Sequence, residues 1–165
     1  MKKIFSFVIM IAVAAIVLGT ANAQDQITLG PSGGYGGSPF VDSVPSGAVP
    51  SEILIRSGAY VDALQMVLQL PNGQIEYMDR HGGNGGDADS FDLRDGEYIT
   101  AIGGRYGRYV DSIQFYTNMR ISTIYGGSGG DADYYYEAPP GWQIVGFYGR
   151  SGDFIDAIGV VLAKL

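Results

Sequence analysis

The stretch HGGNGGDADSFDL, residues 81–93, places four glycines within five consecutive positions, beside residues typical of β-strands. Glycine loses more conformational freedom on folding than any other residue and adds no side chain for packing. Such a run therefore indicates a loop whose backbone must be free of side chains. The same pattern occurs three times, as GGYGG at 33–37, GGNGG at 82–86 and GGSGG at 126–130.

A second motif recurs in step with these glycine loops. Its copies are GAYVD at 58–62, GRYVD at 107–111 and GDFID at 152–156. The loops start 49 and 44 residues apart, and the copies of the second motif start 49 and 45 residues apart. Because two motifs keep nearly the same irregular spacing, the chain contains an internal threefold repeat.

Each repeat predicts two β-strands, one before and one after the second motif. The strand after the motif has apolar residues two positions apart, the period of a half-buried strand. These residues are Leu64, Met66 and Leu68; Ile113 and Phe115; and Ile158, Val160 and Leu162. The repeats predict an all-β fold of three antiparallel sheets that share one core around a pseudo-threefold axis. A sandwich or an eight-stranded barrel is the competing geometry.

Residues 1–23 have the pattern of a cleaved, bacterial-type secretory signal. Lys2 and Lys3 precede an apolar run that ends at the small-x-small sequence Ala21-Asn22-Ala23. We expect cleavage after Ala23, which would leave a single domain over residues 24–165 in the periplasm or outside the cell. A membrane anchor is the alternative, but the apolar run is short for a span.

The composition restricts the classes of partner. The chain has no cysteine, so neither disulfides nor thiolate metal sites are available, and its formal charge is −7. Without Lys2 and Lys3 the charge becomes −9, which disfavours nucleic acid and anionic lipid as partners. A neutral or cationic ligand is favoured.

The aspartate that ends each second motif suggests how an uncharged sugar can be held. A carboxylate accepts two adjacent hydroxyls, a glycine amide can donate without a Cβ atom in the way, and an aromatic ring covers the apolar face of the sugar. The aspartates are Asp62, Asp111 and Asp156, and the neighbouring aromatics are Tyr60, Tyr109 and Phe154. The alternative is that each aspartate only satisfies the amides of its own turn.

Together with DGEYIT at 95–100, VDSIQFYTN at 110–118 and IVGFYGRSGDFIDAIG at 144–159, these motifs resemble the mannose-binding type of jacalin-related lectin. The resemblance covers the chain from Leu29 to the last strand. It implies a β-prism I fold of three four-stranded sheets, calcium-independent binding of mannose- or glucose-containing glycans, no catalysis and no cofactor. Relatives dimerise in several ways, so a homo-oligomer is possible.

The resemblance also implies the site residues, since each family site joins one aspartate turn to one glycine loop. The implied sets are Asp156, Phe154 and the backbone of Asp153 with Gly37; Asp62 and Tyr60 with Gly86; and Asp111 and Tyr109 with Gly130. Phe154 lacks the hydroxyl of its tyrosine counterparts. Arg108 stands where small or acidic residues are usual, and is expected either to add a contact or to block the Asp111 site.

Three other functions compete with sugar binding. GGNGGDADS and GGSGGDADY nearly match a calcium-binding nonapeptide repeat, which would make Asp87, Asp89, Asp131 and Asp133 ligands of a structural calcium ion. A glycosidase would need two carboxylates in different environments, which three equivalent aspartates do not provide, and the lone His81 is better explained as a loop or edge residue. An adhesive module could use Tyr134, Tyr135 and Tyr136 as an exposed patch.

Overall fold

The structure, a computed structural model, describes residues 26–165. The predicted signal segment and its cleavage point lie outside these residues. All strands in residues 26–165 pair in antiparallel fashion, and this part of the chain includes no helix long and apolar enough to cross a membrane.

The strands form three sheets, which we name after the glycine loop that each contains. The first-loop sheet contains β1 (Ile27–Gly33), β2 (Ser38–Val41), β12 (Trp142–Ser151) and β13 (Ile155–Lys164). The second-loop sheet contains β3 (Val49–Ser57), β4 (Val61–Gln69), β5 (Ile75–Tyr77), β6 (His81–Gly82) and β7 (Asp87–Asp92). The third-loop sheet contains β8 (Ile99–Tyr106), β9 (Val110–Thr117), β10 (Tyr125–Gly126) and β11 (Ala132–Glu137).

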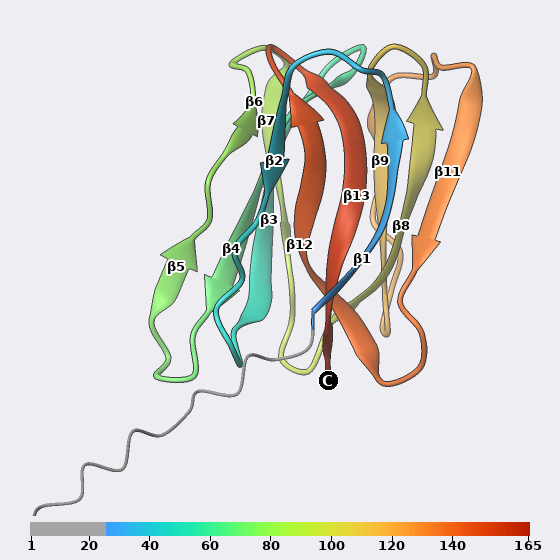
Figure 1. The fold of residues 1–165 in the computed structure, drawn as a ribbon. Helices are drawn as coiled ribbons and strands as arrows, with labels where there is room; N and C mark the ends of the chain where they lie inside the picture. Colours follow the sequence, from blue (N-terminus) through green and yellow to red (C-terminus); the bar gives the residue numbers. More distant parts are fainter. Residues whose placement is uncertain (1–25) are drawn as a thin grey trace, which may run out of the picture.

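All three sheets have the same plan, which confirms the repeat. A central hairpin carries the aspartate motif: β3–β4, β8–β9 or β12–β13. The glycine loop connects the two strands that flank this hairpin, so that β2, β7 and β11 pair with its first strand and β1, β6 and β10 with its second. The first glycine loop therefore lies beside the last aspartate motif, although more than a hundred residues separate them (Figure 1).

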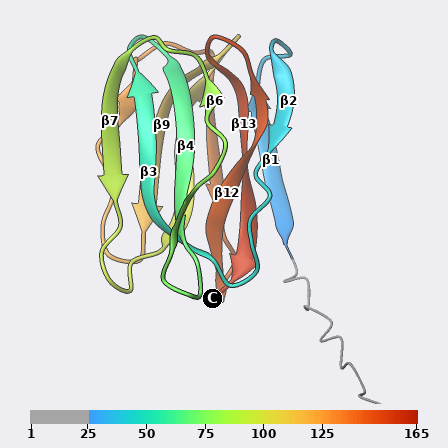
Figure 2. The same ribbon diagram turned by 90° about the vertical axis from the view of Figure 1, so that its left-hand side faces the viewer.

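The prediction of three antiparallel sheets is confirmed, and two details depart from three separate four-stranded sheets. In the second-loop sheet the outer position beside β4 is divided between β5 and β6. The first-loop and third-loop sheets are joined where Ile144 of β12 pairs with Ile99 of β8. Figure 2 shows β7, β3, β4 and β6 side by side, with the first-loop sheet next to them.

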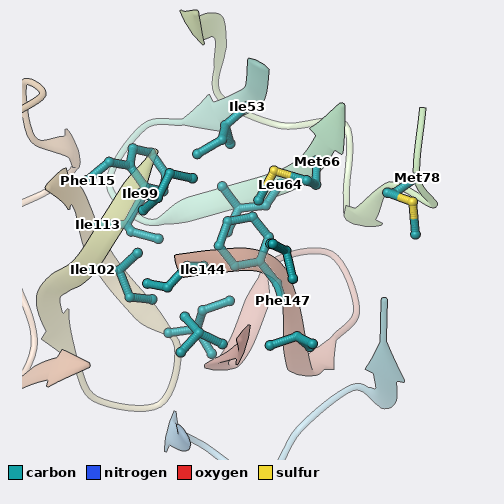
Figure 3. Packing of buried hydrophobic residues seen from close by; sticks show 14 of the residues in the cluster. Ile53, Leu64, Met66, Met78, Ile99, Ile102, Ile113, Phe115, Ile144 and Phe147 are labelled. Atoms are coloured by element: carbon teal, nitrogen blue, oxygen red, sulfur yellow. The ribbon is translucent and has the colours of Figure 1, made fainter. Parts of the chain in front are cut away.

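One hydrophobic core fills the space between the three sheets. The alternating residues of the central hairpins supply it, because every second side chain points inward. Leu64, Ile113 and Phe147 come from three different sheets, are fully buried and point into the shared interior (Figure 3). The shared core explains why sheets of this size are stable together, since none could bury its apolar face alone.

His81 contributes to this packing from the edge of its sheet, so the edge alternative holds and the loop alternative does not. It begins β6, its Nε2 lies 2.7 Å from Oδ1 of buried Asp42, and its ring stacks on Phe40 with 3.8 Å between centroids. The other oxygen of Asp42 accepts the amide of Phe147 at 2.8 Å. This pair therefore ties the second-loop sheet to the first-loop sheet.

The three consecutive tyrosines lie on β11 and alternate between its two faces. Tyr134 is buried and donates its hydroxyl to the carbonyl of Ser112, whereas Tyr135 is 53% exposed on the outer face. The hydroxyl of Tyr136 lies 2.5 Å from that of Ser32. Only one of the three rings is therefore available to a partner on the outer face.

Candidate carbohydrate site

The three glycine loops and the three aspartate turns gather at one end of the molecule, opposite the C-terminus (Figure 1). Each loop lies directly beside the aspartate that the family resemblance implies for it. The second glycine of each loop donates its amide to the backbone carbonyl of that aspartate, at 2.7 Å for Gly34 and Asp156, 2.9 Å for Gly83 and Asp62, and 2.8 Å for Gly127 and Asp111. The structure thus brings all three predicted pairs together.

The aspartate carboxylates occupy the space that side chains on the last two glycines would need. A Cβ atom on Gly36 would lie 2.1 Å from Oδ1 of Asp156, and one on Gly37 would lie 2.5 Å from Oδ2. The other two loops repeat these contacts, with Asp62 against Gly85 and Gly86, and with Asp111 against Gly129 and Gly130. The backbone is therefore bare because the protein's own carboxylate packs against it, a reason that the sequence argument did not include.

The second glycine of each loop is bare for a different reason: it meets the aspartate turn of another sheet. Cβ atoms on Gly34, Gly83 and Gly127 would lie 2.1–2.4 Å from the carbonyl oxygens of Arg108, Asp153 and Ala59, in that order. Each loop is thus held between the aspartate of its own sheet and the turn of a neighbouring sheet.

The middle position of each loop has no such contact, and it is the position that varies. It is occupied by Tyr35, Asn84 and Ser128, all of which are exposed. Tyr35 is 95% exposed at the tip of the first loop. The repeats therefore keep glycine where protein atoms crowd the backbone and vary where the loop faces solvent.

An arginine holds each loop from the outer side, and the sequence argument missed it. Arg56, Arg105 and Arg150 each donate Nε to the carbonyl of the fourth loop residue and Nη2 to that of the fifth, over 2.6–2.8 Å. Each arginine stands six positions before its aspartate, so the repeat itself contained the signal. Arg105 makes a further bond from Nη1 to Asp133 at 2.8 Å.

The three predicted aromatic residues form one cluster on the pseudo-threefold axis. The ring centroid of Tyr60 lies 5.2 Å from that of Tyr109 and 5.2 Å from that of Phe154, and the centroids of Tyr109 and Phe154 are 4.9 Å apart. These separations are typical of packed aromatic pairs. Each half-buried ring thus packs against the other two, which fixes the three aspartate turns relative to one another.

Burial alters the acidity of the aspartates. Each is 4–5% exposed, and burial raises the pKa of Asp62, Asp111 and Asp156 above 3.8. The guanidinium groups of Arg56, Arg105 and Arg150 act in the opposite direction and lower the pKa of the aspartate in the same sheet. The arginine thus opposes the effect of burial and favours the ionised form of the carboxylate.

Arg108 lies between two sites. Its guanidinium carbon is 5.4 Å from the ring centroid of Tyr109, while its backbone carbonyl borders the first loop at Gly34. Its charge lowers the pKa of Asp156, after the larger contributions of burial and Arg150. The family resemblance associates Arg108 with the Asp111 site, and in the structure its backbone also borders the glycine loop beside Asp156.

The chain resembles known lectins over most of its length. A model of the jacalin-like lectin domain matches residues 29–161. Horcolin of Hordeum vulgare is 34% identical over 139 residues, covering 81% of this chain and 94% of its own. Family members are lectins, which bind carbohydrate without catalysis, so the prediction that this chain is not an enzyme is confirmed.

Solved structures support the same assignment. A mannose-binding jacalin-related lectin from Ananas comosus superimposes with a TM-score of 0.74 at 33% identity, covering 85% of this chain and 99% of that protein. Artocarpin in complex with mannotriose gives 0.75 at 26% identity, covering 84% and 97%. These neighbours share the β-prism I fold, and that predicted fold is confirmed. The chain belongs to the family of jacalin-like lectin domains.

Proposed function

We propose that the protein binds mannose- or glucose-type hexoses at up to three sites, without calcium. The observation that carries the proposal is the contact of each aspartate carboxylate with the last two glycines of its loop. This arrangement occurs three times, and at Asp156 it joins segments that are more than a hundred residues apart in the chain. The mannose-binding relatives support the same ligand class.

The chemistry of one site follows from these groups. The carboxylate of Asp156 accepts the hydroxyls at positions 4 and 6 of the hexose, and the amide of Gly37 donates to the sugar. Charge-assisted hydrogen bonds of this kind contribute about 1.5–3 kcal/mol each before the costs of ordering. Phe154 and the backbone of Asp153 complete the site, and Asp62 and Tyr60 with Gly86, and Asp111 and Tyr109 with Gly130, form the other two. An axial 4-hydroxyl does not fit this pattern, so galactose should bind poorly.

Calcium independence is supported by the surroundings of the acidic residues. In the part of the chain that the structure describes, no three His, Cys, Asp or Glu side chains are grouped so that they could hold a metal ion. Asp133, one of the candidate calcium ligands, pairs with Arg105 at 2.8 Å. A chelator should therefore leave both the melting temperature and hexose binding unchanged.

Several sites on one rigid end allow multivalent capture. A single shallow sugar site binds weakly, because the hydroxyl groups it engages also bind water. Two or three sites that reach branches of one glycan raise avidity by about 10²–10⁴, provided that their spacing matches. The packed cluster of Tyr60, Tyr109 and Phe154 fixes that spacing here.

Export through a signal at residues 1–23 is the cellular part of the proposal. Its support is the sequence pattern of Lys2, Lys3 and the apolar run before Ala23. N-terminal sequencing of the protein recovered from the periplasm or the medium should begin at Gln24. Recovery of the intact chain in the membrane would contradict export by cleavage.

The central experiment compares two aspartate variants in a calorimetric titration with methyl α-mannoside, with and without EDTA. Asp156→Ala should remove one site from the binding stoichiometry and leave the fold intact. Asp95→Ala is the matched control, because Asp95 is exposed in the connection between β7 and β8, outside the loops and turns of the candidate sites. Unchanged stoichiometry in Asp156→Ala, or binding that requires calcium, would contradict the proposal.

A further inference from the structure

We infer that Arg56, Arg105 and Arg150 are the positioning residues of the three hexose sites, because each fixes the peptide plane whose amide faces the sugar. The inference rests on the proposed function and goes beyond it. It concerns residues that take no direct part in the hydroxyl contacts.

The contact is the same in all three sheets. In the first-loop sheet, Nε of Arg150 donates to the carbonyl of Gly36 and Nη2 to that of Gly37, both at 2.7 Å. Arg56 makes the equivalent bonds to Gly85 and Gly86 at 2.7 and 2.6 Å. Six hydrogen bonds of normal length, in matched register, are difficult to explain as incidental surface contacts.

Peptide geometry connects this contact to the ligand. The carbonyl of Gly36 and the amide of Gly37 belong to one planar, trans peptide group, in which C=O and N–H point in opposite directions. When Arg150 holds the carbonyl on its own side, the amide of Gly37 must point away from the arginine. That amide is the donor proposed for the hexose, so the arginine determines its direction.

Glycine makes this restraint necessary. The fifth loop residue has a positive φ in all three loops, +60° at Gly37, +62° at Gly86 and +90° at Gly130. Without a Cβ atom these residues have access to many other conformations, so ordering them costs more entropy than ordering any other residue. A guanidinium that binds two successive carbonyls removes this freedom before the sugar arrives.

Arginine suits this role better than lysine. Its planar guanidinium presents donors in a fixed fork that can reach two acceptors at once, whereas the lysine ammonium is a point charge on a flexible stem. Arg150→Lys therefore keeps the positive charge near Asp156 but loses the fork. This substitution separates positioning from the effect of charge on the acidity of Asp156.

The test compares Arg150→Lys with Arg94→Lys, since Arg94 is an exposed arginine in the connection between β7 and β8, away from the glycine loops. Amide hydrogen exchange of Gly37 is measured by NMR without sugar, and affinity for methyl α-mannoside is measured by titration. Arg150→Lys should speed exchange at Gly37 and weaken binding at the Asp156 site, each by about tenfold, the effect of losing one well-held hydrogen bond. Gly86 and Gly130 should be unchanged, as should every site in Arg94→Lys.

A second variant provides chemical rescue. Arg150→Ala should show the same defects, and methylguanidinium should restore both exchange protection and affinity where an equal concentration of methylammonium does not. The inference is overturned if Arg150→Lys leaves Gly37 exchange and affinity unchanged, or if affinity falls equally at all three sites. A wild-type protein that binds no hexose would overturn the proposed function, while Gly37 exchange would still decide whether the arginine orders the loop.

Discussion

The contact between the Asp62 carboxylate and its loop makes a quantitative prediction for Gly86→Ala. Gly86 has φ +62°, and an added Cβ would lie 2.5 Å from Oδ2 of Asp62 and 2.6 Å from the carbonyl carbon of Ser57. Gly73 is the matched control, with φ +82° and no atom within 4 Å of an added Cβ. The two substitutions share the cost of a left-handed backbone and differ in crowding.

The magnitudes follow from these two terms. A left-handed L-residue costs about 1–2 kcal/mol, which is the full effect expected for Gly73→Ala. Crowding of a packed site adds about 1–3 kcal/mol. Gly86→Ala should therefore be destabilised by roughly 2–5 kcal/mol, and its Tm should fall by about 2–4 °C for each kcal/mol in a chain of this size.

Urea denaturation of both variants measures the difference, and calorimetric titration with methyl α-mannoside measures its effect on the site. Gly86→Ala should lose one site from the stoichiometry, because the new methyl group displaces the Asp62 carboxylate, while Gly73→Ala should bind as the wild type does. Equal destabilisation of the two variants would refute the packing argument. Full stoichiometry in Gly86→Ala would refute the assignment of the Asp62 site.

Three further predictions concern titration and buried charge. Because burial raises the pKa of Asp156, acidification should abolish hexose binding with a midpoint above 3.8, measured by titration across pH. Burial acts to raise the pKa of Glu97, but the hydrogen bonds from Arg120, Arg94 and Thr117 outweigh burial and lower this pKa from 4.5 to about 2. The stabilising contribution of the ionised Glu97 carboxylate is therefore complete above pH 4.5 and lost as the pH falls toward 2. Glu97→Ala should lower the free energy of unfolding by about 3–5 kcal/mol at neutral pH, and it should flatten the dependence of urea stability on pH in that window. His81→Ala should destabilise the fold by a similar amount, about 3–5 kcal/mol, because Oδ1 of buried Asp42 loses its His81 partner and only Oδ2 keeps a hydrogen bond, from the amide of Phe147. Asp42→Asn in the same chain should recover part of the loss in a thermal melt.

The regular parts of this fold were predictable because the signals for them are local or repeated. Alternation in VDALQMVLQL marks β4, and the recurrence of Asp62, Asp111 and Asp156 marks three equivalent corners. A threefold repeat of strand pairs leaves few ways to bury one apolar face per sheet. The architecture follows from that constraint and from the family resemblance, whereas the pairing of each glycine loop with its aspartate was implied by the resemblance alone.

The contacts across the chain were not predictable from the same signals. Arg150 bonds to glycines more than a hundred residues earlier in the chain, so no local pattern reveals it, although its recurrence as Arg56 and Arg105 was visible. The clustering of the three turn aromatics depends on how closely the sheets approach their axis. The second-glycine contacts depend on the relative rotation of the sheets, which periodicity does not encode.

Because each glycine loop packs against a turn from a different sheet, no single repeat forms a complete site. Gly34 meets the second turn, Gly83 the third and Gly127 the first, in a closed circuit. A peptide containing one repeat would have every residue type that is proposed to contact the sugar. It would lack the turn of the neighbouring sheet against which its glycine loop packs. Three such peptides would have to trimerise before any of them gained a complete site, and in the single chain the circuit closes only when β1 and β2 dock against β13 and β12.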